Sequence, residues 1–401
     1  MLEGKCIVVG VCGGIAAYKV VEVVSRLKKL GAQVHVIMTE AAREFVGELT
    51  FRTISQNLVY TDMFAEPRTW EVEHIELATK ADLFLLAPAS ANTIAKVANG
   101  IADNMLTTTL LATRAPVLIA PAMNNRMYEN PVTMENMRRL SDRGCDFIDS
   151  SEGFLACGTV GKGRLAEPEQ IVEAVINKIA FEKDMRGMRV LVSAGATREA
   201  LDPVRFLTNH SSGKMGFAIA RAAHRRGACV TLVTGKTALP AIAGVETIEI
   251  ESARQMYEAI LARAANADII VKAAAVSDYT PAQVSADKIK KTDDVLKIEL
   301  VRNPDILYEL GRSKPEGQVL VGFCMETKDL LLQASEKLKR KNCDMIVANN
   351  LFDEGAGFGT DTNTVTILKA DGTRKKTENM PKDALAHVIL DEALSIYHEK
   401  Q

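Results

Sequence analysis

Apolar residues along the first 180 positions gather in short runs, and segments with a helical period separate these runs. The run Lys5–Val11 is continuous, as in a strand that is buried on both faces of a sheet. The amphipathic segment Ile15–Leu30 follows it and ends at a glycine, which predicts a helix. Further strands are expected at Gln33–Thr39, Ala81–Ala87 and Pro116–Ala120. Because strands that alternate with helices form right-handed βαβ units, we expect a parallel sheet in this half.

The same alternation begins again after a charged stretch at residues 181–187. Strands are expected at Met188–Ser193, Cys229–Val233, Ile269–Ala275, Gln318–Phe323, Met345–Ala348 and Thr364–Leu368. Helices are expected at Gly213–Arg226, Asp329–Lys341 and Pro381–His398. The pattern predicts an α/β fold with two doubly wound, mostly parallel-sheet (Rossmann- or flavodoxin-like) domains, one over residues 1–183 and the other over 184–401.

One stretch of the first half departs from the alternation. Glu152–Glu167 contains four glycines and shows little periodicity. It therefore predicts a long functional loop, and Pro168–Lys183 is expected to be helical again.

Composition narrows the range of functions. The chain has 401 residues, and its formal net charge is −2. Proteins that bind duplex nucleic acid usually carry a basic excess, so no nucleic-acid partner is expected. The seven cysteines are scattered and form no C-x-x-C pair, which disfavours a zinc site or a disulfide framework and favours a reducing cytoplasm. No uncharged apolar stretch approaches the ~18 residues of a membrane span, and no signal-type segment precedes Gly13, so we expect no membrane association.

A glycine-rich turn between the first strand and the first helix is a candidate phosphate site. Gly10, Gly13 and Gly14 stand in the spacing G-x-x-G-G. Backbone N–H groups at a helix N-terminus, with no Cβ in the way, can hold a phosphate. The spacing differs from the dinucleotide G-x-G-x-x-G and favours a mononucleotide such as FMN. A tight turn that needs a positive φ is the alternative.

Two polar loops follow two neighbouring strands of the first half. One contains Ser90, Asn92 and Thr93, and the other contains Asn124. Ligands of open α/β sheets bind at the carboxyl ends of strands, so both loops point to one crevice. Each of the first three residues is also an ordinary helix N-cap.

Two reactive side chains lie near these loops in the sequence. His74 follows Trp70, and a lone histidine is more often a structural residue than a catalyst. Cys157 lies in the glycine-rich stretch, where its thiol is a candidate proton donor or nucleophile.

The second half repeats this arrangement with more cations. Ser193–Arg198 and Asn209–Gly216 are turns suited to an anion, although the second is equally well explained as a helix cap. Asp278 ends a strand, where it is placed to bind a ribose hydroxyl or a metal ion. The run Lys288–Lys291 has three lysines, which by themselves favour a solvated face over a triphosphate site.

Downstream, Asn303–Ile306 forms a turn that also begins a helix. Lys337 and Lys341 stand four residues apart on one helix face, so both can reach one ligand.

Taken together, these motifs resemble those of known enzyme families. G-x-x-G-G-I-A-A-Y-K (10–19), P-A-S-A-N-T (88–93), P-A-M-N-x-x-M (121–127) and L-A-C-G-x-x-G-x-G-R (155–164) resemble the flavin-dependent cysteine decarboxylases. More narrowly, they resemble the first half of the bifunctional phosphopantothenoylcysteine decarboxylase/phosphopantothenate–cysteine ligases of coenzyme A synthesis. In the second half S-A-G-x-T-R, D-P-V-R-F, N-H-S-S-G-K-M-G, A-A-V-x-D-Y, K-I-K-K and N-P-D-I resemble the ligase domain of the same family, so the likeness spans nearly the whole chain.

For the first half the resemblance implies FMN-dependent oxidation and decarboxylation of the cysteinyl side chain, which gives 4′-phosphopantetheine. By resemblance His74 assists the oxidation, Asn124 holds the substrate carboxylate and Cys157 donates a proton. The implied FMN-binding residues are Gly10, Gly13, Gly14, Thr39, Ser90, Asn92 and Thr93, and the implied substrate-binding residues are Met127 and Arg164.

For the second half it implies joining of L-cysteine to 4′-phosphopantothenate with CTP and Mg²⁺, through an acyl-cytidylate. Lys288 is then expected to stabilise charge in the first step and Asn209 to position the intermediate for the second. The implied CTP-binding residues are Ala273, Ala274, Asp278, Lys288, Asn303, Pro304, Asp305, Ile306, Phe323, Lys337 and Lys341, and Asp278 is also the expected metal ligand.

The family also implies a homo-oligomer, with trimeric decarboxylase and dimeric ligase parts that combine into a dodecamer. Two other functions stay open at this point: a flavoprotein oxidoreductase fused to a nucleotide-binding regulatory module, and a non-catalytic nucleotide sensor.

Overall fold

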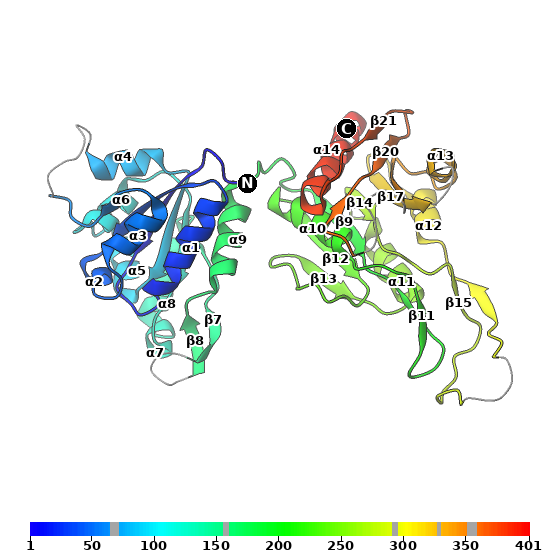
Figure 1. Ribbon diagram of the computed structural model, residues 1–401, viewed down its shortest axis with the longest axis horizontal. Helices are drawn as coiled ribbons and strands as arrows, with labels where there is room; N and C mark the ends of the chain where they lie inside the picture. Colours follow the sequence, from blue (N-terminus) through cyan, green and yellow to red (C-terminus); the bar gives the residue numbers. More distant parts are fainter. Residues whose placement is uncertain (65–71, 155–159, 291–295, 327–329, 351–358) are drawn as a thin grey trace. The chain divides into compact units, whose positions relative to one another are not determined.

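The computed structural model describes residues 1–64, 72–154, 160–290, 296–326, 330–350 and 359–401 (Figure 1). The chain divides into two compact units, Met1–Glu182 and Lys183–Gln401. Each unit has its own sheet and its own buried apolar clusters.

The sheet of the first unit is parallel throughout, in the order β3-β2-β1-β4-β5-β6. Its strands are β1 (Cys6–Val11), β2 (Gln33–Met38), β3 (Val59–Tyr60), β4 (Leu83–Ala89), β5 (Val117–Pro121) and β6 (Asp146–Phe147). Every residue of β1 and β4 is buried, which explains their nearly unbroken apolar runs. The chain leaves β1 for β2 on one side and returns to β4 on the other, so the strand order reverses between β1 and β4. Ligands of such sheets bind at this reversal.

Helices cover both faces of this sheet. They are α1 (Ala17–Lys29), α2 (Glu40–Arg43), α3 (Glu48–Ser55), α4 (Glu73–Lys80), α5 (Ala91–Ala98), α6 (Met105–Ala112), α7 (Asn125–Tyr128), α8 (Pro131–Asp142) and α9 (Pro168–Ile179). One apolar cluster joins the sheet to α1, α3 and α9, and the other joins it to α4, α5, α6 and α8. The helix expected after the glycine turn begins at Ala17.

The prediction of a long loop at Glu152–Glu167 is wrong. The chain forms an antiparallel hairpin there, with strands β7 (Ser151–Phe154) and β8 (Val160–Arg164). A two-stranded ribbon apart from the main sheet needs no alternation of apolar and polar residues, so the hydrophobic pattern gave no strand signal.

The second unit has a mixed sheet in the order β13-β12-β9-β14-β17-β18-β20-β21. Its parallel strands are β9 (Arg189–Ala194), β12 (Cys229–Thr234), β13 (Glu246–Glu249), β14 (Ile269–Lys272), β17 (Val319–Glu326) and β18 (Met345–Asn350). Two antiparallel strands, β20 (Thr366–Lys369) and β21 (Arg374–Lys376), close one edge. The predicted class of two doubly wound, mostly parallel α/β domains is confirmed.

Helices again lie on both faces. One apolar cluster holds α10 (Lys214–Arg225) and α14 (Lys382–Lys400), and the other holds α11 (Ala253–Ala264), α12 (Ile306–Ser313) and α13 (Leu330–Arg340). Hydrogen bonds from Arg226, which directly follows α10, join the first residues of the unit to this helix end. Arg226, which is buried, donates to Asp184 at 2.9 Å and to Asp391 of α14 at 2.7 Å.

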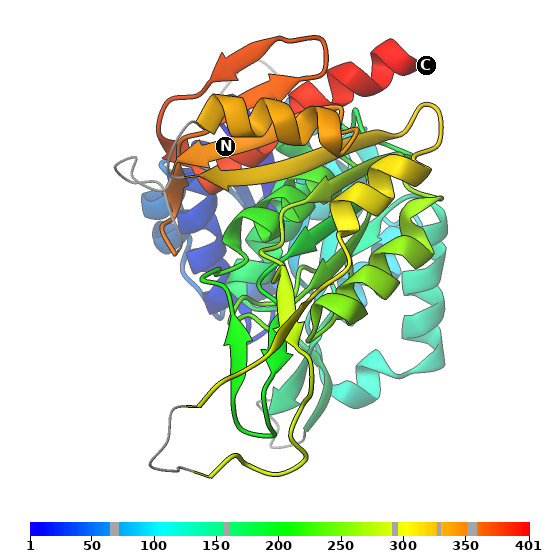
Figure 2. The ribbon, with the colours of Figure 1, turned by 90° about the vertical axis from the view of Figure 1, so that its right-hand side faces the viewer.

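Two short antiparallel ribbons leave this sheet and extend together in both views (Figures 1 and 2). One pairs β10 (Arg198–Ala200) with β11 (Phe206–Thr208), and the other pairs β15 (Tyr279–Pro281) with β16 (Leu300–Arg302). A third small pair joins β19 (Thr362–Asn363) to β22 (Met380–Pro381). Of the helices in the described ranges, none is both long and apolar enough to cross a bilayer.

Candidate functional site

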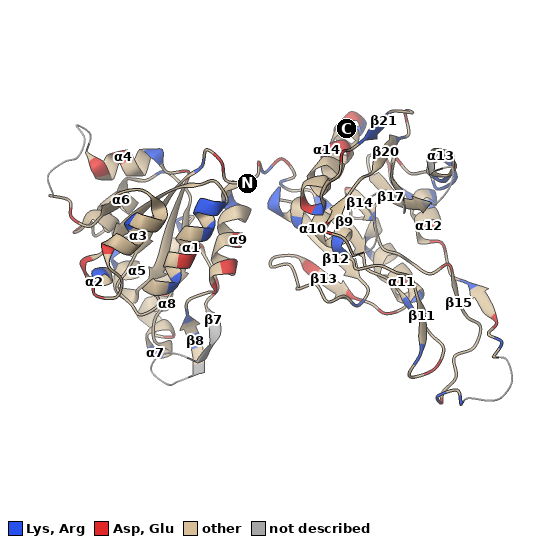
Figure 3. Ribbon diagram, in the orientation of Figure 1, with Lys and Arg blue, Asp and Glu red and all other residues tan. Residues whose placement is uncertain are grey.

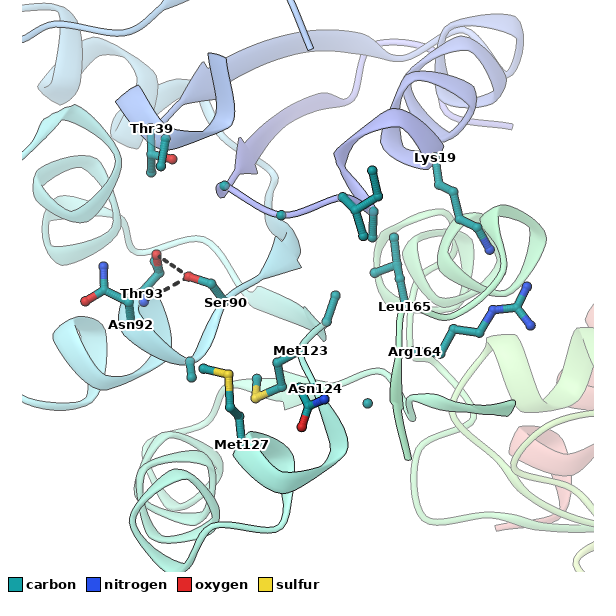
Figure 4. A pocket seen from close by; sticks show the side chains of 18 of the residues that line it. Lys19, Thr39, Ser90, Asn92, Thr93, Met123, Asn124, Met127, Arg164 and Leu165 are labelled. Carbon is teal, nitrogen blue, oxygen red and sulfur yellow. Dashed lines mark hydrogen bonds between the residues drawn. The ribbon is translucent and has the colours of Figure 1, made fainter. Parts of the chain in front are cut away.

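A cavity of about 770 Å³ lies at the carboxyl ends of β1, β4 and β5 in the first unit (Figure 4). This volume is within the range of small-molecule and cofactor sites. The sequence-predicted residues that line it are Gly13, Gly14, Thr39, Ser90, Asn92, Thr93, Asn124, Met127 and Arg164. The two polar loops predicted to meet in one crevice therefore do so.

The glycine turn lines one wall of this cavity. A Cβ on Gly13 would lie 2.5 Å from the Ala41 Cβ and 2.9 Å from the Ala41 carbonyl oxygen, whereas a Cβ on Gly14 would meet no atom within 4 Å. Neither glycine has a left-handed φ, so the alternative of a turn that requires a positive φ fails. Close packing against Ala41 accounts for Gly13, and open space in front of Gly14 leaves the backbone accessible. No side chain caps α1, whose first turn also lines the cavity.

Hydroxyl groups line another part of the cavity. Ser90 caps α5 by accepting a hydrogen bond from the Thr93 N–H at 3.3 Å, and the two hydroxyl oxygens lie 3.2 Å apart. The thiol of Cys12 donates to the Thr93 hydroxyl at 3.2 Å, and burial raises the pKa of this thiol despite that contact. Thr39 caps α2 by accepting from the Ala42 N–H. Helix capping thus explains Ser90 and Thr39 in part. Because both cap residues line the cavity, α5 and α2 also begin beside it.

The loop that follows β5 lines a further part of the cavity. Asn124 caps α7, where its side-chain oxygen accepts from the Arg126 N–H at 2.9 Å. Met123, Asn124 and Met127 lie side by side there (Figure 4).

Two cations stand at the edge of the cavity, Lys19 from α1 and Arg164 from β8. Both pair with Glu167, the N-cap residue of α9, at N–O distances of 3.0 and 2.8 Å. The hydrogen bond from Lys19 lowers the pKa of the Glu167 carboxyl. Among the cavity-lining residues that the structure describes there is no carboxylate, so the site favours an anionic or neutral ligand.

Two predicted residues of this half, Gly10 and His74, do not line this cavity. Gly10 is within β1, where a Cβ would lie 2.3 Å from Leu106 Cδ1, so packing in the sheet explains this glycine. His74 is half-buried on α4 and does not line the cavity of its own chain. Cys157 is outside the described residues.

A second cavity, of about 510 Å³, lies in the second unit at the carboxyl ends of β14 and β17. The sequence-predicted residues in its lining are Ala274, Asp278, Asn303, Pro304, Asp305, Ile306, Phe323, Lys337 and Lys341. Asp305 caps α12 by accepting from the Tyr308 N–H at 3.0 Å, and Lys341 pairs with the same carboxylate. The pKa of Asp305 is lowered: burial opposes the shift, and the contacts with Lys341 and Tyr308 outweigh it. Lys337 donates to the Phe323 carbonyl oxygen at 2.8 Å.

Ala273, Asn209 and Lys288 do not line this cavity. Asn209 contacts its wall, because its amide donates to the carbonyl oxygen of Val276 at 3.2 Å. Lys288 is exposed on the segment between β15 and β16.

The residue after Lys288 is Ile289, whose backbone N–H and carbonyl oxygen both form hydrogen bonds. The N–H of Ile289 donates to Asp202 at 3.1 Å, and its carbonyl oxygen accepts from Arg205 at 2.6 Å. Asp202 also accepts from the Val204 and Arg205 N–H groups, each at 2.8 Å, and its side chain is fully enclosed. These contacts lower the pKa of Asp202 well below its usual range although burial opposes the shift. They tie the segment that carries Lys288 to the β10–β11 ribbon.

Two family models match the chain, one over each half. A family model described as Flavoprotein matches residues 1–180, and one described as DNA/pantothenate metabolism flavoprotein C-terminal domain matches residues 185–397. The chain is 49% identical over 399 residues to the coenzyme A biosynthesis bifunctional protein CoaBC of Bacillus subtilis, with 99% of this chain and 98% of the relative covered. It is 42% identical over 402 residues to CoaBC of Escherichia coli, with 100% and 99% covered. The chain belongs to the CoaBC family.

Two solved structures each match about half of the chain. The crystal structure of the C-terminal domain of a CoaBC protein is 40% identical and covers 54% of this chain and 100% of that one, with a TM-score of 0.48. A mutant PPC decarboxylase complexed with pantothenoylaminoethenethiol is 32% identical and covers 43% of this chain and 96% of that one, with a TM-score of 0.40. Membership in the CoaBC family confirms the resemblance that the sequence motifs indicated.

Several cavity-lining residues were missed by sequence reasoning. In the first unit they include Ile15, Tyr18 and Lys19, which stand inside the motif that carried the CoaBC resemblance. In the second unit they include Lys272, Arg302 and Arg340. Lys272 had a visible signal, since it is the one charged residue in the otherwise apolar run Ile269–Ala275. Figure 3 shows the basic residues of α13 that accompany it.

Proposed function

We propose that this chain catalyses two reactions of coenzyme A biosynthesis. The second unit joins L-cysteine to 4′-phosphopantothenate with consumption of CTP, and the first unit decarboxylates the product to 4′-phosphopantetheine. The observation that carries the proposal is the pairing of two separate cavities, each at strand carboxyl ends, with full-length similarity to bifunctional CoaBC proteins.

The first cavity fits FMN. A glycine turn with open space in front of Gly14, the uncapped first turn of α1, and a lining without carboxylates together suit a phosphate monoester. FMN, when bound, supplies a two-electron acceptor and donor for the cysteinyl side chain. Thr39, Ser90, Asn92 and Thr93 would hold its polar parts.

The substrate would meet the remaining side chains of this cavity. We assign the substrate carboxylate to Asn124, with Arg164 and Met127 beside it, since all three line the wall near β5 and β8. Loss of this carboxylate as CO₂ requires an adjacent electron sink, which the oxidised sulfur-bearing carbon provides. Cys157 keeps its predicted role as proton donor.

In the second unit the carboxylate of 4′-phosphopantothenate is a poor electrophile until it is activated as an acyl phosphate. Lys288 is assigned to stabilise the charge that develops in this activation, and Asn209 to position the activated intermediate for attack by the cysteine amine. Among the described residues no group of three or more histidine, cysteine or carboxylate side chains forms a metal cage. We therefore assign Mg²⁺ to the nucleotide phosphates, with Asp278 as its protein ligand, because Mg²⁺ commonly binds through few carboxylates plus substrate phosphates.

We also propose that the protein works as a homo-oligomer in the cytoplasm, with trimeric and dimeric contacts that combine into a dodecamer. Two observations support self-association: His74 lies outside the cavity lining of its own chain, and Ile15 and Tyr18 at the cavity are each 60% exposed. A second copy of the chain would bring its own His74 to this surface.

The first test is mass spectrometry of the purified protein mixed with 4′-phosphopantothenate, CTP, Mg²⁺ and L-cysteine. We expect CMP and 4′-phosphopantetheine to appear together. CMP with accumulating phosphopantothenoylcysteine would support the ligase and count against the decarboxylase. Absence of CMP would overturn the ligase assignment, and a need for an external electron donor would favour the flavoprotein oxidoreductase that the sequence left open.

Replacement of Asp202 by asparagine is expected to slow pyrophosphate release by roughly ten- to a hundredfold, because charge-assisted hydrogen bonds that fix Ile289 beside Lys288 are lost. The loss should appear in kcat more than in the KM for CTP. Asp371→Asn, at an exposed turn of the same unit, is the matched control. Equal rates in both variants would show that Asp202 does not position Lys288.

A further inference from the structure

A buried lysine, Lys272, stands at the carboxyl end of β14 and lines the second cavity. All four residues of β14 are buried, and Lys272 is 8% exposed. Within the described ranges, no hydrogen bond or ion pair joins its Nζ atom to another group. By comparison, the buried Lys382 donates to the Thr360 carbonyl oxygen at 2.6 Å, and the half-buried Lys314 pairs with Asp344 at 2.9 Å.

The sheet leaves room for this lysine. Lys272 is in register with Ser193 of β9 and with Gly322 of β17, and the glycine places no side chain beside it. The lysine is one of the residues that line the second cavity, so its side chain borders the space that a ligand would fill.

The charged groups around Lys272 do not neutralise it. The pKa of its amine is lowered to about 7: burial is the largest cause and Lys337 on α13 adds to it, while Asp305 and Asp278 oppose the shift. Asp305 is already engaged by Lys341, and Asp278 is exposed to solvent. The protonated amine therefore lacks a compensating anion when the cavity holds no ligand.

The cavity as a whole is cationic. Arg302, Lys337, Arg340 and Lys341 line it together with Lys272, against two carboxylates, Asp278 and Asp305. Lysine is a point-charge ligand for phosphate, and such a contact is strengthened when water is excluded.

We propose that Lys272 binds the phosphate chain of the nucleotide and takes up a proton as the nucleotide enters. This inference rests on the proposed function, which assigns CTP to the same cavity. The phosphate oxygens supply the negative charge that the surroundings of Lys272 lack, so the ammonium form becomes the stable one in the complex.

The direction of the pH effect follows from this assignment. Because the pKa of the free amine is lowered to about 7, we expect partial protonation near neutral pH in the free protein and full protonation in the complex. Binding of CTP should then take up about 0.5 proton through Lys272 at about pH 7, and about 0.9 at about pH 8. The affinity should consequently fall as the pH rises above neutrality, by more than roughly tenfold between about pH 7 and about pH 9.

Isothermal titration calorimetry of the full-length protein with MgCTP, in buffers of different ionisation enthalpy, measures this proton uptake. Lys272→Met is the test variant, because methionine suits the apolar strand, and Lys272→Gln keeps a polar end group if the first variant folds poorly. Subtracting the uptake of the variant from that of the natural chain removes protons that the nucleotide and the other side chains exchange. Lys382→Met is the matched control, since it removes another buried lysine outside this cavity.

We expect the Lys272-dependent uptake to be absent from both Lys272 variants and retained in the control. Tripolyphosphate, which lacks base and sugar, should show the same uptake. CTP binding with equal uptake in the natural chain and in Lys272→Met would overturn this inference and leave the proposed function standing. Uptake with CTP but none with bound tripolyphosphate would overturn the assignment to the phosphate chain. Absence of CTP binding altogether would overturn the proposed function together with the inference.

Discussion

A Lys288→Gln variant is expected to release pyrophosphate from CTP and 4′-phosphopantothenate at least about a hundredfold more slowly than the natural chain. Lys288 is exposed and carries the charge assigned to the first step, while the backbone of the next residue is held by Asp202 and Arg205. The ammonium is thus presented from a fixed backbone, and glutamine at this place supplies a dipole instead of a full charge. The rate is measured by a coupled pyrophosphate assay without cysteine, which isolates this step.

Two comparisons make the result specific. Lys290→Gln removes a second exposed lysine of the same run and should keep most of the rate. Decarboxylation of supplied phosphopantothenoylcysteine by the Lys288→Gln protein should be unchanged, because the residues that line the first cavity all belong to the other unit. Pyrophosphate release at the natural rate would remove Lys288 from the mechanism.

A Gly13→Ala variant is expected to be purified with little or no flavin and to lose decarboxylation with it. The added Cβ would lie 2.8 Å from the Ala41 carbonyl carbon as well as 2.5 Å from its Cβ. These are backbone-anchored atoms that cannot rotate away, so the turn at residues 13–16 must move, and that turn lines the cavity. Such overpacking typically costs ~1–3 kcal/mol, which corresponds to roughly five- to 150-fold in affinity if it falls on the bound state.

The visible absorbance of the purified protein, relative to its protein absorbance, reports the flavin content. Gly47→Ala is the control in the same unit, because no atom lies within 4 Å of the added Cβ and Gly47 has an ordinary φ of −68°. Pyrophosphate release should be unaffected in both variants. A Gly13→Ala protein with full flavin content would show that this close approach does not shape the cofactor site.

The hydrophobic pattern predicted the central strands well and the peripheral ones poorly. β1, β9 and β14 are buried on both faces, so burial itself imposes continuous apolar runs that a reader of the sequence can find. The ribbons β7–β8, β10–β11 and β15–β16 lie outside the main sheets. No core constrains their composition, and their strands were not predicted.

Some candidate site residues could likewise be found from the sequence, and others could not. Asn124 and Asn303 could be found because polar loops after apolar strands are recognisable in the sequence. Lys19 and Arg164 depend on Glu167, and this long-range contact cannot be read from spacing alone. The roles of Lys288 and Asn209 came from family resemblance, and neither residue lines the second cavity.

The hydrogen bonds of Asp202 and Arg205 have a mechanical consequence for the ligase reaction. They join the segment with Lys288 to the β10–β11 ribbon, and β11 ends immediately before Asn209. The residue assigned to the first chemical step and the residue assigned to the second are therefore carried on one connected framework. We expect a shift of the Lys288 segment to be transmitted through Asp202 and Arg205 to the strand that precedes Asn209, which would couple the two half-reactions structurally.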